Sequence, residues 1–303
     1  MENNTSFSNI QEKQFTKKVL LTYFIITFLI TWACWITAIL FLRANDWPIP
    51  SVLTFLERST SVQSKSQKWL NFIFSLGTFG PLISAIITQV IYYDLAHLKA
   101  YFKRFFYFKF ELKWYLIIIL IPLASSAIGI LSALLNPETR PNLFQFNFPW
   151  YFPFLLFLNQ TFSSGLEEPG WRGLATPEMQ KIKSAEDSGY IIGTIWSIWH
   201  FPFLIFLYGE MYNWNIFLMI ISLVGYIGLT IPMAIITVWL YNNTKSIGAL
   251  IIFHGLLNTL PQILLGGITD SFSGILIAVG TWIFAAFLSK KYGKQTLVKK
   301  EDI

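Results

Sequence analysis

The chain has 303 residues, of which 54% are hydrophobic and only 13% are charged. A soluble domain carries about 25% charged residues, so this composition excludes an ordinary soluble protein. The net charge of +6 indicates basic loops beside anionic lipid headgroups, and we expect no nucleic-acid partner. The single cysteine, Cys34, excludes a framework of disulfides.

The apolar residues come in runs of about 20, the length that an α-helix needs to cross a hydrocarbon core of about 30 Å. The sequence therefore predicts an all-α polytopic membrane protein with about eight transmembrane helices, forming one domain over residues 1–303 within the lipid bilayer. In chain order, the runs lie at roughly 19–42, 69–93, 114–135, 149–168, 189–208, 215–240, 246–265 and 272–288.

The basic residues predict the orientation of these helices. An even number of spans places both termini on the same side, and short cytoplasmic loops retain Lys and Arg. Most of the 22 basic residues lie on the side of the termini. We therefore expect a multi-pass protein of the cell membrane with cytoplasmic N- and C-termini.

Two connecting segments differ in composition from the apolar runs. Residues 43–68 contain Pro48, Pro50 and a serine-rich end, and we expect an irregular extracellular loop there. Residues 94–113 alternate basic and aromatic side chains. This pattern is typical of a helix lying on the cytoplasmic surface of the membrane.

The fourth run ends in an unusually polar stretch, which contains "SSGLEEPGWRGL" at residues 163–174. Two stripes recur every four residues: Asn159, Ser163 and Glu167, followed by Gln160, Ser164 and Glu168. Unsatisfied polar groups that face lipid cost several kcal/mol each. Helix contacts made by small polar residues explain the serines and asparagine, but they do not explain two carboxylates.

The two carboxylates have different expected partners. Glu168 and Arg172 stand four residues apart, which suits an ion pair if the helical turn continues past Pro169. Glu167 has no evident local partner. A lone carboxylate in apolar surroundings is a good proton acceptor, so Glu167 is a candidate general base.

Histidines also lie inside the predicted spans. His200, in "WSIWHFPF", is followed by Pro202, which favours a kink. His254 and Asn258 stand four residues apart on one helix face and offer two donors for an oxyanion. Counted at about 1.5 Å per residue, both histidines lie at a depth near that of Glu167. We expect a polar cavity at this depth, open to the cytoplasm.

Three motifs on separate spans resemble those of the CPBP family of intramembrane proteases, which includes the type II CAAX prenyl endopeptidases and proteins implicated in bacteriocin self-immunity. They are "EEPGWR", "WSIWH" and "HGLLN", and "GTFGPLISAII" at 77–87 resembles a further helix of the family. The resemblance covers roughly residues 70–290. Trp196 stands where the second motif often has Phe and preserves an aromatic wall.

The resemblance implies that the protein hydrolyses a peptide bond with an activated water molecule. Glu167 would be the general base, with His200 helping to hold the water. His254 and Asn258 would stabilise the oxyanion. Glu168 and Arg172 would support the site.

Metal dependence is left open by the sequence. Glu167, His200 and His254 offer a ligand set for zinc with an open position for water. The chain has no His-Glu-x-x-His helix, which excludes the common zinc-protease motif. We expect a metal-free reaction that needs no cofactor, with the zinc site as the alternative.

Two other classes of protein use buried Glu and His residues. A transporter would show paired halves with broken helices, and no such symmetry is present. A catalytically silent membrane scaffold or immunity protein is expected to lack one of the polar positions, and all are present. The expected partner is a peptide or protein substrate, either membrane-anchored or a small peptide precursor.

Overall fold

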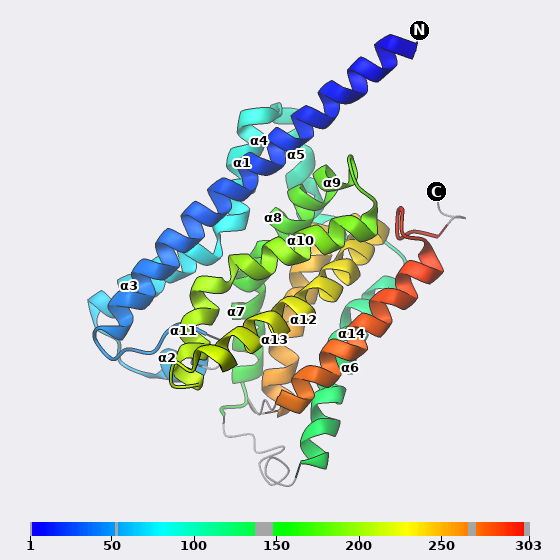
Figure 1. Cartoon of the computed structure of the whole chain (residues 1–303). Helices are drawn as coiled ribbons and strands as arrows, with labels where there is room; N and C mark the ends of the chain where they lie inside the picture. The colour runs from blue at the N-terminus through cyan, green and yellow to red at the C-terminus, as the bar shows by residue number, and fades with distance from the viewer. Residues whose placement is uncertain (1, 52–53, 137–147, 266–270, 300–303) are drawn as a thin grey trace.

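The computed structural model describes residues 2–51, 54–136, 148–265 and 271–299. All regular elements within these ranges are helical, which confirms the predicted all-α polytopic fold (Figure 1). The α-helices in chain order are α1 (Glu2–Arg43), α2 (Phe55–Thr60), α3 (Lys65–Thr78), α4 (Gly80–Tyr92), α5 (Leu95–Lys103), α6 (Leu112–Leu135), α7 (Phe152–Phe162), α8 (Glu168–Gly170), α9 (Thr176–Gln180), α10 (Ala185–Trp199), α11 (Phe201–Met211), α12 (Ile216–Thr244), α13 (Ile247–Leu265) and α14 (Ser271–Tyr292). Shorter turns are the 3₁₀ turns η1 (Arg104–Phe106) and η3 (Ser164–Glu167) and the π-helical turn η4 (Trp171–Ala175).

Five of the described helices are long and apolar enough to cross a membrane. They are Ile10–Arg43 of α1, α6, α12, α13 and Ser273–Tyr292 of α14. Large apolar side chains on their outer faces are exposed, including Leu29, Leu120, Ile216 and Ile283. Such faces are suited to lipid, and the protein is therefore a multi-pass membrane protein.

Two further spans are bent helix pairs, which brings the number of spans to as many as seven. Helices α3 and α4 meet at 53°, and α10 and α11 meet at 58° with His200 between them. Pro202 lacks a backbone N–H and cannot continue the helical ladder, which accounts for the expected kink. The remaining predicted span, 149–168, which is the fourth in chain order, is not one helix, because α7 ends at Phe162 and irregular turns follow.

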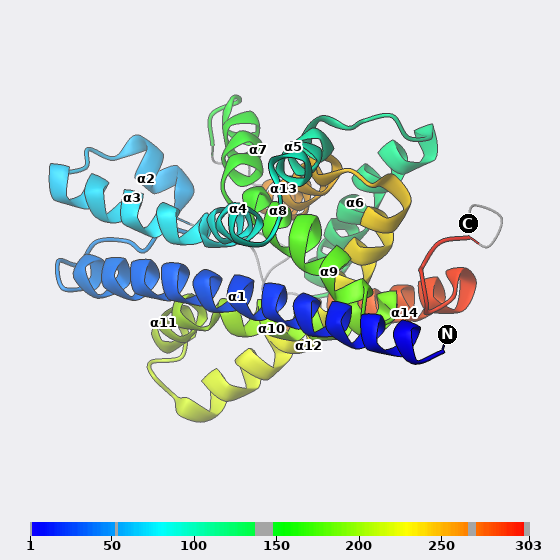
Figure 2. The same cartoon turned by 90° about the horizontal axis from the view of Figure 1, so that it is seen from above.

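The start of α1 and the end of α14 lie at the same end of the helix bundle (Figures 1 and 2). The segment after α14 packs onto the start of α10 and the end of α12 at this end. The backbone N–H of Ala185 donates to the carbonyl of Gln295 at 2.9 Å, and the Asn242 amide donates to Thr296 at 2.8 Å. The connection between α1 and α3 lies at the opposite end.

The two connecting segments singled out in the sequence have some helical structure. Residues 43–68 contain α2 and the start of α3, and residues 94–113 contain α5 and η1. Phe106 and Leu112 are strongly exposed. Whether these segments lie on the extracellular and cytoplasmic sides, respectively, stays a prediction.

The short helix α8 is held closely between α1 and α4. A Cβ atom at Gly170 would collide with the Tyr23 hydroxyl and with the backbone of Pro81, the proline of the "GTFGPLISAII" helix. The absence of a side chain at Gly170 therefore lets the carboxylate-bearing segment approach α4. This contact fixes the position of Glu167 and Glu168 relative to the rest of the bundle.

Candidate active site

The break after α7 turns both carboxylates into the protein interior. Ser163 has non-helical backbone angles, and its hydroxyl donates to the carbonyl of Asn159 at 2.6 Å, which ends the helix. A Cβ at Gly165 would lie 2.8 Å from the Ile251 carbonyl oxygen, so the next turn packs directly on α13. As a result Glu167 and Glu168 are only 3% and 1% exposed.

Glu167 is held through one carboxylate oxygen. The indole N–H of Trp196 donates to Glu167 Oε2 at 2.9 Å. The other oxygen, Oε1, receives no hydrogen bond from any described residue, and Glu167 lines a cavity. One oxygen is thus positioned by the protein, while the other remains available to a water molecule or substrate.

His200 presents one ring nitrogen to the same cavity. Its Nδ1 lies 2.9 Å from the backbone carbonyl of Trp196. Because a carbonyl only accepts, Nδ1 must carry the proton, and Nε2 of the neutral ring is an acceptor. The imidazole packs edge-on against Trp199 and Tyr226, with ring centroids 4.6 and 5.3 Å apart. His200 is therefore fixed in one tautomer and one orientation.

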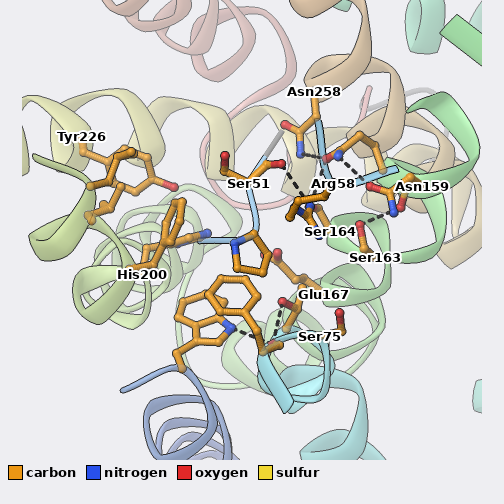
Figure 3. Close-up of a pocket in the computed structure, with 18 of the residues that line it drawn as sticks. Ser51, Arg58, Ser75, Asn159, Ser163, Ser164, Glu167, His200, Tyr226 and Asn258 are labelled. Atoms are coloured by element: carbon orange, nitrogen blue, oxygen red, sulfur yellow. Dashed lines mark hydrogen bonds between the residues drawn. The ribbon is translucent and has the colours of Figure 1, made fainter. Parts of the chain in front are cut away.

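A polar cavity of about 390 Å³ joins these two residues to groups from other helices (Figure 3). Its polar lining comes from α3, α7 and η3, the α10–α11 bend, α12 and α13. These polar residues are Ser75, Thr78, Asn159, Gln160, Ser163, Ser164, Glu167, His200, Tyr226 and Asn258. Residues of the fourth apolar run and of the second and third motifs therefore line the same cavity.

The cavity extends from Glu167 towards the α1–α3 connection, where Pro50, Ser51 and Arg58 contribute to its lining. This end of the bundle is opposite to the start of α1 and the end of α14. The side of the membrane to which the cavity opens stays a prediction.

The predicted ion pair between Glu168 and Arg172 is present, with Nη1 and Oε1 3.2 Å apart and both side chains buried. Arg172 Nε also donates to the Thr237 hydroxyl at 2.9 Å, and its guanidinium lies 4.4 Å from the centre of the Trp196 ring. The Nδ1 of His254 contacts the same Glu168 oxygen at 2.8 Å. Glu168 therefore receives bonds from η4 and from α13.

The spacing of His254 and Asn258 predicted that both side chains point at one target. In the structure they contact different partners. His254 bonds to Glu168 and is not among the cavity-lining residues. Asn258 lines the cavity, and its amide donates to Gln160 Oε1 at 3.2 Å. The two side chains share a helix face, but each is directed to a partner that spacing along the helix cannot reveal.

The proposed zinc ligands do not form a coordination group in this structure. Within the described ranges, no three side chains of His, Cys, Asp or Glu are gathered closely enough to hold a metal ion. The bonds that His200 and His254 make through Nδ1 fix their ring orientations. The arrangement therefore offers no three-ligand set composed of Glu167, His200 and His254.

Sequence reasoning missed three side chains of the site. Trp196 was expected only to form an aromatic wall, yet its N–H binds Glu167. Gln160 was assigned to a polar stripe without a partner, and Tyr226 was not singled out at all. The polar group of each side chain indicated that it could take part in the site, but nothing in the sequence indicates in which direction that group points.

The fold and the site together define a helical membrane protein with a buried glutamate and histidine cluster beside an intramembrane cavity. Residues 148–260, which contain all three motifs, match the family model described as type II CAAX prenyl endopeptidase Rce1-like. The predicted resemblance to the CPBP family is therefore confirmed over this segment.

A curated relative agrees with this assignment. The chain is 34% identical over 157 residues to CAAX prenyl protease 2 of Methanococcus maripaludis. The match includes 46% of this chain and 53% of the relative, so the chain spans about half the length of the relative it matches.

Proposed function

We propose that this protein is an intramembrane endopeptidase in which Glu167 activates a water molecule for hydrolysis of a peptide bond. The observation that carries this proposal is the arrangement of Glu167, with one oxygen bound to Trp196 and the other free beside a polar cavity. The substrate class is a membrane-anchored peptide or protein. The relative's name, CAAX prenyl protease, suggests a prenylated substrate.

The contacts support a simple division of roles. Water would donate one hydrogen bond to Glu167 Oε1 and another to His200 Nε2, the acceptor nitrogen. Glu167 would take a proton from the water as the oxygen attacks the carbonyl carbon of the substrate. It would then return the proton to the leaving nitrogen, and His200 would keep the water in line.

The group that would stabilise the oxyanion is the Asn258 amide, which lines the cavity. This amide has two hydrogens, and one remains after its bond to Gln160. His254 uses Nδ1 for Glu168 and does not line the cavity, so its proposed role is to hold Glu168.

Removing this donor should slow the chemical step. We expect Asn258→Ala to cost about 2.7–4 kcal/mol of transition-state stabilisation, as with other oxyanion donors. The measurement is kcat and KM on a cleaved peptide. A raised KM with unchanged kcat would instead assign Asn258 to substrate binding.

The proposed activity is tested with purified protein in lipid nanodiscs and a quenched fluorescent peptide, supplied with and without a prenyl group. Cleavage of either peptide by the wild type, and of neither by Glu167→Gln, supports the proposal. A preference for the prenylated peptide would establish the substrate class. We also propose that the reaction is metal-free, so zinc chelators should leave the rate unchanged.

The orientation of the chain in the membrane is a separate proposal. We propose that the termini are cytoplasmic, which places the Arg58 end of the cavity towards the extracellular side. In a Cys34→Ala background, a cysteine at exposed Ser61 should react with a membrane-impermeant maleimide in intact cells. A cysteine at exposed Glu12 should react only after permeabilisation, and the reverse pattern would invert the orientation.

A further inference from the structure

Trp196 contacts four residues of the candidate active site. Its indole N–H donates to Glu167, and its backbone carbonyl accepts from His200. The guanidinium of Arg172 lies over one face of the ring at 4.4 Å. The ring of His254 meets it edge-on, with centroids 5.8 Å apart. One residue therefore connects the water-binding groups to the buried ion pair.

We propose that Trp196 is a positioning residue that holds Glu167 in its reactive orientation through the indole N–H. The inference rests on the proposed function and adds a requirement to it. A glutamate side chain has three rotatable bonds, and Glu167 is fixed by no other hydrogen bond from the described residues. Without the indole N–H, Oε1 would no longer be directed to the water site.

The charge on Glu167 strengthens this contact. An indole nitrogen is a donor only, and a bond from a donor to a buried carboxylate is stronger than one between neutral groups. Trp196 is only 7% exposed, so water competes poorly for either partner. The same residue fixes His200 through its carbonyl, and that bond is independent of the side chain. Changing the side chain therefore perturbs Glu167 while preserving the bond to His200.

The ring has a second contribution that must be separated from the first. A cation above an indole face is stabilised by about 0.5–2 kcal/mol, so Trp196 also supports Arg172. Phenylalanine would reduce this support as well as remove the N–H. Replacing Trp196 with 3-benzothienylalanine, in which sulfur takes the place of the N–H, retains the bicyclic ring and removes only the donor.

The matched control is Trp282, which lies on α14 and does not line the cavity. Its indole N–H donates to the Gly228 carbonyl at 2.7 Å, so Trp282→Phe also removes one indole hydrogen bond within the bundle. The quenched prenylated and unprenylated peptides are the probes. Thermal unfolding in detergent reports whether each variant folds.

We expect both Trp196 variants to lower kcat about 10- to 100-fold, the loss expected for one hydrogen bond to a charged group, with KM changed less than about twofold. Trp282→Phe should leave both parameters unchanged. Full kcat in the benzothienylalanine variant, with a loss only in Trp196→Phe, would overturn the proposal and leave ring packing as the role.

A measurement without substrate separates this inference from the proposed function. The ultraviolet resonance Raman difference between wild type and Trp196→Phe isolates the signal of this indole, which is sensitive to hydrogen bonding. Glu167→Leu should shift that signal to a free N–H, and an unshifted signal would overturn the contact. If the contact is present but wild type cleaves neither peptide, the proposed function fails and the positioning role fails with it.

Discussion

Glu167→Gln should remove proteolysis while the protein still folds and inserts into the membrane. Glutamine has nearly the same shape, and its amide oxygen can accept the Trp196 N–H that Glu167 Oε2 accepts at 2.9 Å. It cannot take a proton from water. Loss of a general base lowers kcat by about 10²–10⁴-fold, and we expect a loss in this range with an unaltered melting temperature.

Glu178→Gln is the matched control for this experiment. Glu178 is also a buried carboxylate, 6% exposed, but it lies on α9, outside the cavity, and pairs with Lys181 at 2.8 Å. This change should leave kcat unaltered even if it lowers the melting temperature. Full activity in Glu167→Gln would exclude Glu167 as the base and would direct attention to Glu168, the other carboxylate of the cluster.

Arg172→Ala should destabilise the protein strongly as well as reduce activity. Arg172 is fully buried and balances the charge of Glu168, which is itself 1% exposed. Removing one partner of a buried ion pair leaves the other charge uncompensated, and the expected cost is about 3–5 kcal/mol of unfolding free energy. The bond to Thr237 and the contact with the Trp196 ring would be lost too.

Two further variants distinguish this effect from a general loss of packing. Arg43→Ala breaks a partly exposed ion pair with Glu210, for which we expect only about 0–1 kcal/mol. Adding Glu168→Gln to Arg172→Ala removes the uncompensated charge and should restore part of the lost stability. Chemical denaturation in detergent checks both. An Arg172→Ala protein as stable as wild type would contradict a structural role for the pair.

The helical membrane fold was predictable because its signals are local. Apolar runs long enough to cross the bilayer predict spans wherever the helix continues, as in α6 and α12. The bend at His200 follows from Pro202, which cannot donate a backbone hydrogen bond. The span predicted from the fourth apolar run was wrong, because composition alone did not show that the helix ends at Phe162 and that short turns follow it.

The site was only partly predictable, because contacts between residues close in sequence follow from helical spacing and contacts between distant residues do not. The Glu168–Arg172 pair follows from helical spacing and is present. The bonds between Trp196 and Glu167, and between Gln160 and Asn258, join residues 29 and 98 positions apart. Such partners are set by how helices pack and rotate.

The most direct test of the central claim compares peptide termini in membrane fractions of cells that make the wild type or Glu167→Gln at equal levels. We predict new termini that appear only with the wild type, which would demonstrate proteolysis, identify a substrate and implicate Glu167 together. Identical sets of termini from the two proteins would contradict an endopeptidase dependent on Glu167.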